Sequence, residues 1–450
     1  MKKAVWAALA VLAAVSPVAA QTPPVAIPAS DFGPVWTGFY VGAAFGAGGT
    51  VNKLDSSTPG FSTTFDGAGG SGVLGLVYGG FDYQVSPRGL LGVLAELTYS
   101  GFQGSASAQV SGANANVNSN TGFGWAALAR AGVLASPATL LYLVGGYTGR
   151  NLHSDGFATA GGASASFSND QTVNGWTIGP GFETMLSRNV SAKLEYRYSQ
   201  YGRTMLAGTG IGLTPYDHTI RAGVSYRFGG LGVASSNERT PPAPGNVNWT
   251  GFYGGVAGGA GMGFSRVNAT AFGASAGFTG GGQGLLGGFF AGADYQFAPN
   301  ALVGAMADIT WTGIQSTFNV ATPGGNASVS AQANQQWSVM GRLGWLPVAS
   351  TLLYAAGGFT QLNLHSTVSA LSSAPFITND TTFNGFAVGP GIETVITGGW
   401  TTRLEYRFSQ FDTQNVSPGI AVQPSNHTIR AGLSYKFGMG TGVSTAQAAD

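Results

Sequence analysis

Polar and apolar side chains alternate in two runs that end the first half of the chain, SAKLEYRYSQ at 191–200 and HTIRAGVSYRF at 218–228. One face of the first run is charged and carries Lys193, Glu195 and Arg197. The opposite face carries Leu194, Tyr196 and Tyr198. Because neighbouring side chains leave a strand on opposite sides, a period of two sustained over this length predicts β-strands.

The two faces also predict which side is wet. A transmembrane barrel turns its apolar face to lipid and its polar face to a central lumen, whereas a soluble sheet does the reverse. If Lys193, Arg197 and Arg221 faced lipid, each would cost about 2–4 kcal/mol near the membrane midplane. We therefore expect the charged face to point inward and the aromatic face outward.

The pattern occurs twice. The segment from Trp36 returns from Trp249, and Arg130 and Glu195 are matched by Arg342 and Glu405, which gives a repeat with an offset of about 212 residues. In the first repeat we predict eight strands. They lie near 36–48, 72–84, 89–102, 121–134, 139–152, 174–187, 189–203 and 216–228.

The predicted connections alternate in length. Short turns lie at 85–88, 135–138 and around 187–189, with equivalents at 298–300, 347–350 and 397–399. The connections at 49–71, 103–120, 153–173 and 204–215 are long and rich in Ser, Gly, Ala and Asn, and we expect them to be loops. Short periplasmic turns and long outer loops are typical of outer-membrane barrels.

No water satisfies a free strand edge at membrane depth, so the sheet has to close. The fold class is therefore all-β, and we expect an antiparallel up-and-down arrangement of two tandem eight-stranded barrels. The alternative is one sixteen-stranded barrel, which would enclose a water-filled channel. Balanced lumen charges and a complete start and end in each repeat favour two barrels.

Composition supports export and a membrane location. Charged residues make up 8% of the chain, the net charge is +1, and there are no cysteines. A net charge near zero argues against nucleic acid as a partner. The start, MKK followed by an apolar run and Val18-Ala19-Ala20, predicts a secretory signal peptide.

The expected domains follow from these boundaries. They are a signal peptide at 1–20, a Pro-rich linker at 21–35, barrel unit 1 at 36–228, a periplasmic linker at 229–248, barrel unit 2 at 249–437 and a polar tail at 438–450.

The inward charges are of both signs, and buried charges need partners. We therefore predict an ion-pair network that plugs each lumen; a charged constriction in an open pore is the functional alternative. In unit 1 the candidates are Glu96, Arg130, Glu183, Lys193, Glu195, Arg197, Arg221 and Arg227, with Asp82. In unit 2 they are Asp308, Arg342, Glu393, Arg403, Glu405, Arg407, Arg430 and Lys436.

Aromatic residues near the strand ends predict two membrane-interface girdles. The candidates are Tyr83, Tyr99, Trp125, Trp176, Tyr198, Tyr226, Phe228, Tyr435 and Phe437.

The histidines do not favour an enzyme. His153 is followed by Ser154, and adjacent strand residues point to opposite faces, which is poor geometry for a base and its nucleophile. No acid has a spacing that would obviously orient His153 or His365. His218 and His427 are expected at the rim, where strand eight begins, and the four histidines are too scattered for a metal site. No catalytic, metal or cofactor residue is predicted.

The segments WTGFYVG at 36–42, GGFDYQ at 79–84, KLEYRY at 193–198 and the closing HTIRAGVSYRF, with GRLGW and LLYAAGGF in unit 2, are similar to the OmpA-like, opacity-type surface-antigen barrels of Gram-negative bacteria. The resemblance covers nearly all of both units. The doubling, and the tail after Phe437, depart from the family pattern, in which the last aromatic commonly ends the chain and is read by the barrel assembly machinery. Haem capture, found in some relatives, is not favoured here.

The expected function is structural and at the surface of the outer membrane. Expected partners are outer-membrane lipid and lipopolysaccharide, the barrel assembly machinery, and host or neighbour-cell surface molecules that could bind the polar loops. The alternatives are a porin for small solutes and a soluble secreted β-protein.

Overall fold

The computed structural model describes residues 36–206, 210–228, 247–271, 274–323, 325–369 and 377–438. The predicted signal peptide and Pro-rich linker, nearly all of the linker between the repeats and most of the tail lie outside the described residues. None of the described segments forms a helix that is long and apolar enough to cross a membrane.

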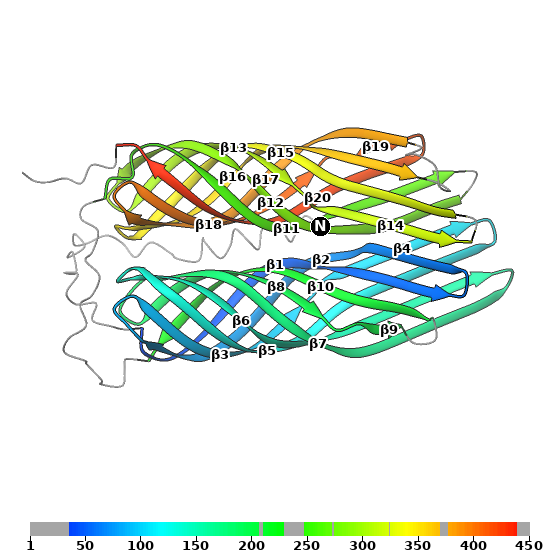
Figure 1. Ribbon diagram of the computed structural model, residues 1–450, viewed down its shortest axis with the longest axis horizontal. Coiled ribbons are helices and arrows are strands. Elements are labelled where there is room, and N and C mark those ends of the chain that lie inside the picture. Colours follow the sequence, from blue (N-terminus) through cyan, green and yellow to red (C-terminus); the bar gives the residue numbers. More distant parts are fainter. Residues whose placement is uncertain are drawn as a thin grey trace, which may run out of the picture. The chain divides into compact units, whose positions relative to one another are not determined.

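All regular structure in the described residues is β-strand (Figure 1). In the first repeat the strands are β1 (Gly38–Thr58), β2 (Phe61–Gln84), β3 (Gly89–Ser100), β4 (Gln103–Val110), β5 (Ala113–Ser136), β6 (Thr139–Ala160), β7 (Ala163–Met185), β8 (Val190–Tyr201), β9 (Thr204–Leu206) and β10 (Ile211–Arg227). In the second they are β11 (Gly251–Ala271), β12 (Ala274–Ala298), β13 (Ala301–Thr312), β14 (Gln315–Thr322), β15 (Gly325–Val348), β16 (Thr351–Ser369), β17 (Ile377–Thr397), β18 (Trp400–Phe411), β19 (Gln414–Ser417) and β20 (Ile420–Lys436).

Each repeat closes on itself. The first strand of unit 1, β1, pairs antiparallel with β2 on one side and with β10 on the other, where Ala43 lies opposite Val224. In unit 2, β11 pairs with β12 and β20, and Val256 lies opposite Leu433. The short strands β4 and β9 continue the lines of β3 and β8, so ten strands occupy eight positions in each wall. The prediction of two tandem eight-stranded antiparallel barrels is confirmed.

The short turns lie at one end of each barrel, which we call the short-turn end. They connect β2 to β3, β5 to β6 and β7 to β8 in unit 1, as predicted, and the equivalent strands in unit 2. The Gly179-Pro180-Gly181 segment of β7 forms no bulge, because the register against β8 is the same on both sides of it. A Cβ on Gly179 would lie 1.7 Å from the Tyr196 carbonyl oxygen, so the backbones approach too closely there for any side chain.

The prediction of long loops at the other end, which we call the extended end, is wrong. Most of 49–71 is strand, since β1 continues to Thr58 and β2 begins at Phe61. The segments 103–120, 153–173 and 204–215 are likewise mostly strand. Their Ser, Thr, Asn and Ala side chains are small and mostly polar on both faces, so the strands can continue where both faces are wet.

These extensions end in tight turns built on glycine. The chain reverses between β6 and β7 at Gly161-Gly162, with φ of 57° and 87°. Two consecutive residues with positive φ are what the type I′ hairpin turn requires, and glycine adopts them without steric cost.

The sheet also continues from one repeat to the other at the extended end. Residues 62–66 of β2 pair antiparallel with 317–321 of β14. Residues 106–109 of β4 pair in the same way with 275–278 of β12. The sixteen-stranded alternative is thus not realised where β1 meets β10, but both repeats share one sheet at their extended ends.

Closure within each repeat can be tested directly, because the chain has no native cysteine. Ala43→Cys combined with Val224→Cys places two cysteines opposite each other on β1 and β10. We expect them to form a disulfide on mild oxidation, seen as a mobility shift on a non-reducing gel. Val224→Cys combined with Val256→Cys is the control, because those positions lie on strands that do not pair; a cross-link there would contradict closure within the repeat.

Candidate functional site

Burial alternates along the walls in the sense that the sequence predicted. On β5, Leu128 and Arg130 are each 4% exposed, whereas the outward side chains Trp125 and Val133 are 38% and 57% exposed. Arg130 bonds to carboxylates on β2 and β7, strands that do not neighbour β5 in the wall, so these side chains meet across the interior. The candidate functional site is therefore the lumen of each barrel.

The layer nearest the short-turn end of unit 1 is a four-membered ion-pair ring. Arg130 donates from Nε to Asp82 Oδ1 at 2.7 Å and from Nη1 to Glu183 Oε2 at 2.8 Å. Arg227 donates from Nη1 to Asp82 Oδ2 at 2.9 Å and from Nη2 to Glu183 Oε1 at 2.8 Å. Four strands contribute one side chain each, and all four side chains are at most 2% exposed. The ring crosses the whole width of the lumen.

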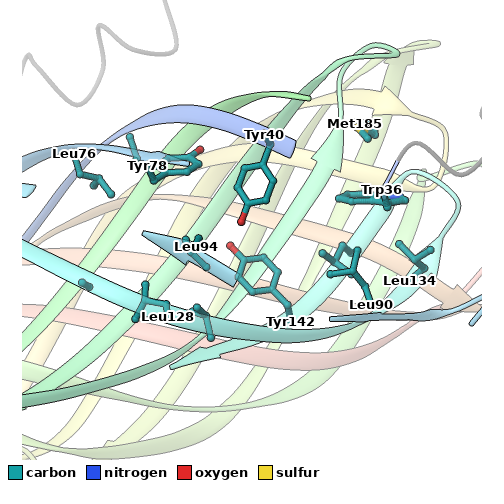
Figure 2. Packing of buried hydrophobic residues seen from close by; sticks show 14 of the residues in the cluster. Trp36, Tyr40, Leu76, Tyr78, Leu90, Leu94, Leu128, Leu134, Tyr142 and Met185 are labelled. Carbon is teal, nitrogen blue, oxygen red and sulfur yellow. The ribbon is translucent and has the colours of Figure 1, made fainter. Parts of the chain in front are cut away.

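Aromatic side chains enclose this ring. The Arg130 guanidinium carbon lies 4.7 Å from the ring centre of Tyr40 and 5.1 Å from that of Tyr142. Figure 2 shows the hydroxyl groups of these two tyrosines turned toward each other, with Trp36 and Leu90 farther along. The aromatic faces add cation–π attraction to the ion pairs and fill the remaining space.

A second layer lies farther along the lumen. Arg221 Nη1 donates to Glu96 Oε1 at 2.6 Å. Arg197 Nη2 lies 2.8 Å from Glu195 Oε1 and 3.4 Å from Glu96 Oε2. Tyr142 donates to Glu195 Oε2 at 2.8 Å, which links this layer to the first.

Unit 2 repeats both layers with conservative changes. Arg342 donates to Asp294 Oδ1 at 2.7 Å and to Glu393 Oε2 at 2.9 Å, and Lys436 takes the place of Arg227 beside Asp294. In the second layer, Asp308 accepts from Arg407 Nη1 at 2.5 Å and from Arg430 Nη1 at 2.7 Å. Glu405 accepts from Arg407 Nη2 at 2.6 Å and from Tyr354 at 2.8 Å.

In unit 1, Lys193 is the cation with the weakest carboxylate contact among these residues. Its Nζ is 3.9 Å from Glu195 Oε2, and it lies 3.5 Å from the ring centre of Tyr78. The equivalent Arg403 of unit 2 has its guanidinium carbon 3.3 Å from the ring centre of Phe290. An aromatic face thus replaces a carboxylate as the main partner at this position of both barrels.

A third polar layer, nearer the extended end, was missed by the sequence analysis. In unit 1, Arg150 Nη2 lies 3.2 Å from Asp217 Oδ1 and donates to Thr50 at 3.1 Å. In unit 2, the neutral side chains of Gln336 and Thr360 bond instead, at 2.9 Å. Arg150 and Tyr142 are an even number of residues apart on β6, so their side chains point to the same, inward face. This spacing could have identified Arg150 from the sequence.

The predicted girdle residues point outward at different depths. Tyr83, Tyr99, Trp125, Trp176, Tyr226, Phe228, Tyr435 and Phe437 are exposed on the outer surface. Tyr198 is half-buried and lies between Trp176, Tyr216 and His218. Their role at the membrane interface stays a prediction.

The expectation that no acid orients His153 or His365 is wrong. His153 Nδ1 lies 2.7 Å from Asp170 Oδ1, and His365 Nδ1 lies 2.8 Å from Asp380 Oδ1, each directly across a strand pair. The pairs were missed because the segments carrying the aspartates were expected to be loops. Ser154 is buried while His153 is partly exposed, consistent with opposite faces. Nowhere in the described ranges do three or more His, Asp or Glu side chains gather in a way that could hold a metal ion.

The expectation that His218 and His427 begin strand eight at the rim is wrong. They lie inside β10 and β20 and are buried, with Nδ1 2.6 Å from the Tyr196 hydroxyl and 2.8 Å from the Tyr406 hydroxyl, respectively.

At the extended end, Arg203 donates two hydrogen bonds to Asp55, of 3.2 and 2.6 Å, and these hold the pKa of that carboxyl below its ordinary value.

Closed antiparallel walls with charge inside and exposed apolar rows outside define the class of transmembrane β-barrels. The chain belongs to the outer membrane protein beta-barrel domain family, which matches residues 7–228 and again 233–437. It is 30% identical over 246 residues to the 31 kDa outer-membrane immunogenic protein of Brucella melitensis, a match that covers 51% of this chain and 100% of that protein. The protein is located in the outer membrane, as predicted.

Other similarities are shorter or more distant. The 25 kDa outer-membrane immunogenic protein of Brucella abortus is 43% identical over 56 residues, which cover 12% of this chain and 26% of that protein. Neisserial surface protein A is 21% identical, with 43% of this chain and 98% of that chain covered and a TM-score of 0.23. The toluene transporter TodX of Pseudomonas putida is 11% identical, with 88% and 89% covered and a TM-score of 0.27.

Proposed function

We propose that the protein is a non-enzymatic structural and surface-display protein of the outer membrane, with each lumen closed by ion pairs. The observation that carries this proposal is the ring of Asp82, Arg130, Glu183 and Arg227, which joins four strands across the interior of unit 1. Its side chains are buried from solvent, whereas the charges of a water-filled channel would be exposed.

The energetics support the same proposal. Removing one partner from a buried ion pair leaves the other charge desolvated and unpaired, which costs about 3–5 kcal/mol. Opening the lumen for solutes would break several such pairs at once. The lumen charges therefore favour a lumen that stays closed and makes the barrel rigid, and not a gate that opens readily.

The extended ends support the display role. The extensions are built mainly from neutral Ser, Thr, Asn, Ala and Gly, which suits a surface that meets water on both faces. The Brucella relatives are named immunogenic. For this chain we propose contact with outer-membrane lipid and lipopolysaccharide, assembly by the barrel assembly machinery, and an outer surface open to host or neighbour-cell molecules. Residues 1–20 would direct export and then be removed.

Conductance in planar bilayers tests the closed lumen against the porin alternative. We expect small, flickering currents from the native protein, because lumens closed by ion pairs would offer no continuous water path. Replacing Arg130 and Glu183 together by serine should increase the conductance, provided that heat-modifiable gel migration shows a folded barrel. Large, steady single-channel steps from the native protein would instead favour a porin.

A further inference from the structure

The two repeats exchange strand partners at the extended end. Near the short-turn end β2 pairs with β3 of its own repeat, but farther out its residues 62–66 pair with β14 of the other repeat. In the same way, β12 pairs first with β13 and then, at 275–278, with β4. Both barrels open between equivalent strands and pair across the gap, so these strand edges are not left free.

Residues at this junction contact their own equivalents in the other repeat. A Cβ added to Gly69 would lie 3.0 Å from Gly281 Cα, and one added to Gly281 would lie 3.1 Å from Gly69 Cα. These two glycines are 212 positions apart, which is the offset of the repeat. Only residues without a side chain let the two backbones approach this closely.

Phe65 of β2 packs against two strands of the other repeat at the junction. Its ring centre lies 6.5 Å from that of Phe278 on β12 and 6.0 Å from that of Phe318 on β14, both edge-on. Close by, Ser316 donates to the Asp66 carbonyl at 3.3 Å. Side-chain packing therefore accompanies the backbone pairs.

The same relation holds along the barrel walls. Outward side chains at equivalent positions form one apolar cluster, which contains Phe182, Leu194, Tyr196 and Ile220 together with Ile392, Leu404, Tyr406 and Ile429. Leu194 is 6% exposed, whereas Val224, which also points outward, is 52% exposed. At the short-turn end, the hydroxyls of Thr139 and Thr351, again 212 positions apart, lie 2.8 Å from each other. Contacts between equivalent residues are the mark of a two-fold, isologous interface.

We propose that each repeat carries a docking surface for a second copy of its own kind, so that the protein is an internal dimer held together by its strand exchange and apolar face and not by the linker. The surface comprises the junction segments of β2, β4, β12 and β14 and the apolar cluster. The inference is independent of whether the lumens are closed.

Cleavage of the linker tests the proposal in the full-length protein. A protease site is inserted within 233–246, with an affinity tag on one repeat only, and the purified, folded protein is cut in mild detergent. We expect the untagged repeat to stay bound to the tagged one and the two to co-elute at the size of the uncut protein. Elution as two separate species of half the mass would overturn the proposal.

A variant pair connects the result to the junction. Phe65→Ser removes the ring that contacts both strands of the other repeat, and we expect at least a tenfold increase in dissociation of the cut halves. Phe157→Ser is the matched control, because Phe157 lies on an extension, in β6, whose strand partners belong to its own repeat. Equal dissociation of the two variants would contradict the role of the junction.

Cysteine pairs test the exchanged register itself. Thr64→Cys with Asn319→Cys places two thiols on directly opposite residues of β2 and β14, and a disulfide should join the halves after linker cleavage. Thr64→Cys with Ser328→Cys is the control, since Ser328 lies one strand farther away on β15, about 10 Å from Thr64 and beyond disulfide reach. A failure of the first pair under conditions that oxidise Ala43→Cys with Val224→Cys would overturn the exchange.

Discussion

Replacing Glu183 by glutamine is expected to destabilise unit 1 by about 3–5 kcal/mol. Glu183 accepts hydrogen bonds from Arg130, Arg227 and Ser191 at 2.6–2.8 Å and is fully buried. The neutral amide keeps the volume but removes the charge that balances two desolvated guanidinium groups. The measurement is urea unfolding in detergent, followed by heat-modifiable migration of the full-length protein.

The repeat supplies two controls for this prediction. Glu393→Gln removes the equivalent carboxylate of unit 2. In that variant, limited proteolysis should cleave unit 2 more readily than unit 1. Adding Arg227→Gln to Glu183→Gln should recover part of the lost stability, because it removes one of the unpaired cations. An unchanged unfolding midpoint for Glu183→Gln would show that the ring does not hold the barrel together.

The second large loss of stability is expected when a positive charge is placed on the outer face of the wall. Val77 lies on β2 opposite Ala43 and Leu97 and is 56% exposed on the outside of the wall. We expect Val77→Arg to cost about 2–4 kcal/mol, since it places a guanidinium among acyl chains near the midplane. The cost should appear as a lower folded fraction after refolding into lipid vesicles.

The same substitution on the extension should be nearly neutral. Val117 is 43% exposed on β5, but it lies in the extension, which we expect to be in water. Val117→Arg therefore adds the same charge without burying it in lipid. If both variants refold equally well, the outer row at Val77 does not face hydrocarbon.

The sequence predicted the strands wherever the two faces of a strand have different surroundings. Lys193, Glu195 and Arg197 alternate with apolar residues because one side meets partner charges and the other meets lipid or protein. Beyond the barrel both faces are wet, so Ser105, Ala106 and Ser107 show no contrast although they lie in β4. The period of two carries no information where both faces are alike, and the extensions were therefore predicted as loops.

The lumen residues could be identified by parity, but their partners could not. Parity placed Arg130 and Glu183 inside; which carboxylate meets which guanidinium depends on the shear of the wall, which one sequence does not reveal. The apolar cluster between the repeats was also hidden. Leu194 and Val224 are both apolar outward-facing residues in the sequence pattern. In the structure Leu194 packs against the other repeat, whereas Val224 is exposed on the outer surface.

The exchange of lysine and arginine between the two lumens has a practical consequence. Unit 1 carries Lys193 with Arg227, and unit 2 carries Arg403 with Lys436, so each lumen contains one primary amine, at a different layer. Amine-selective acylation followed by mass spectrometry can therefore probe water access to two separate depths of the protein, with no engineered label.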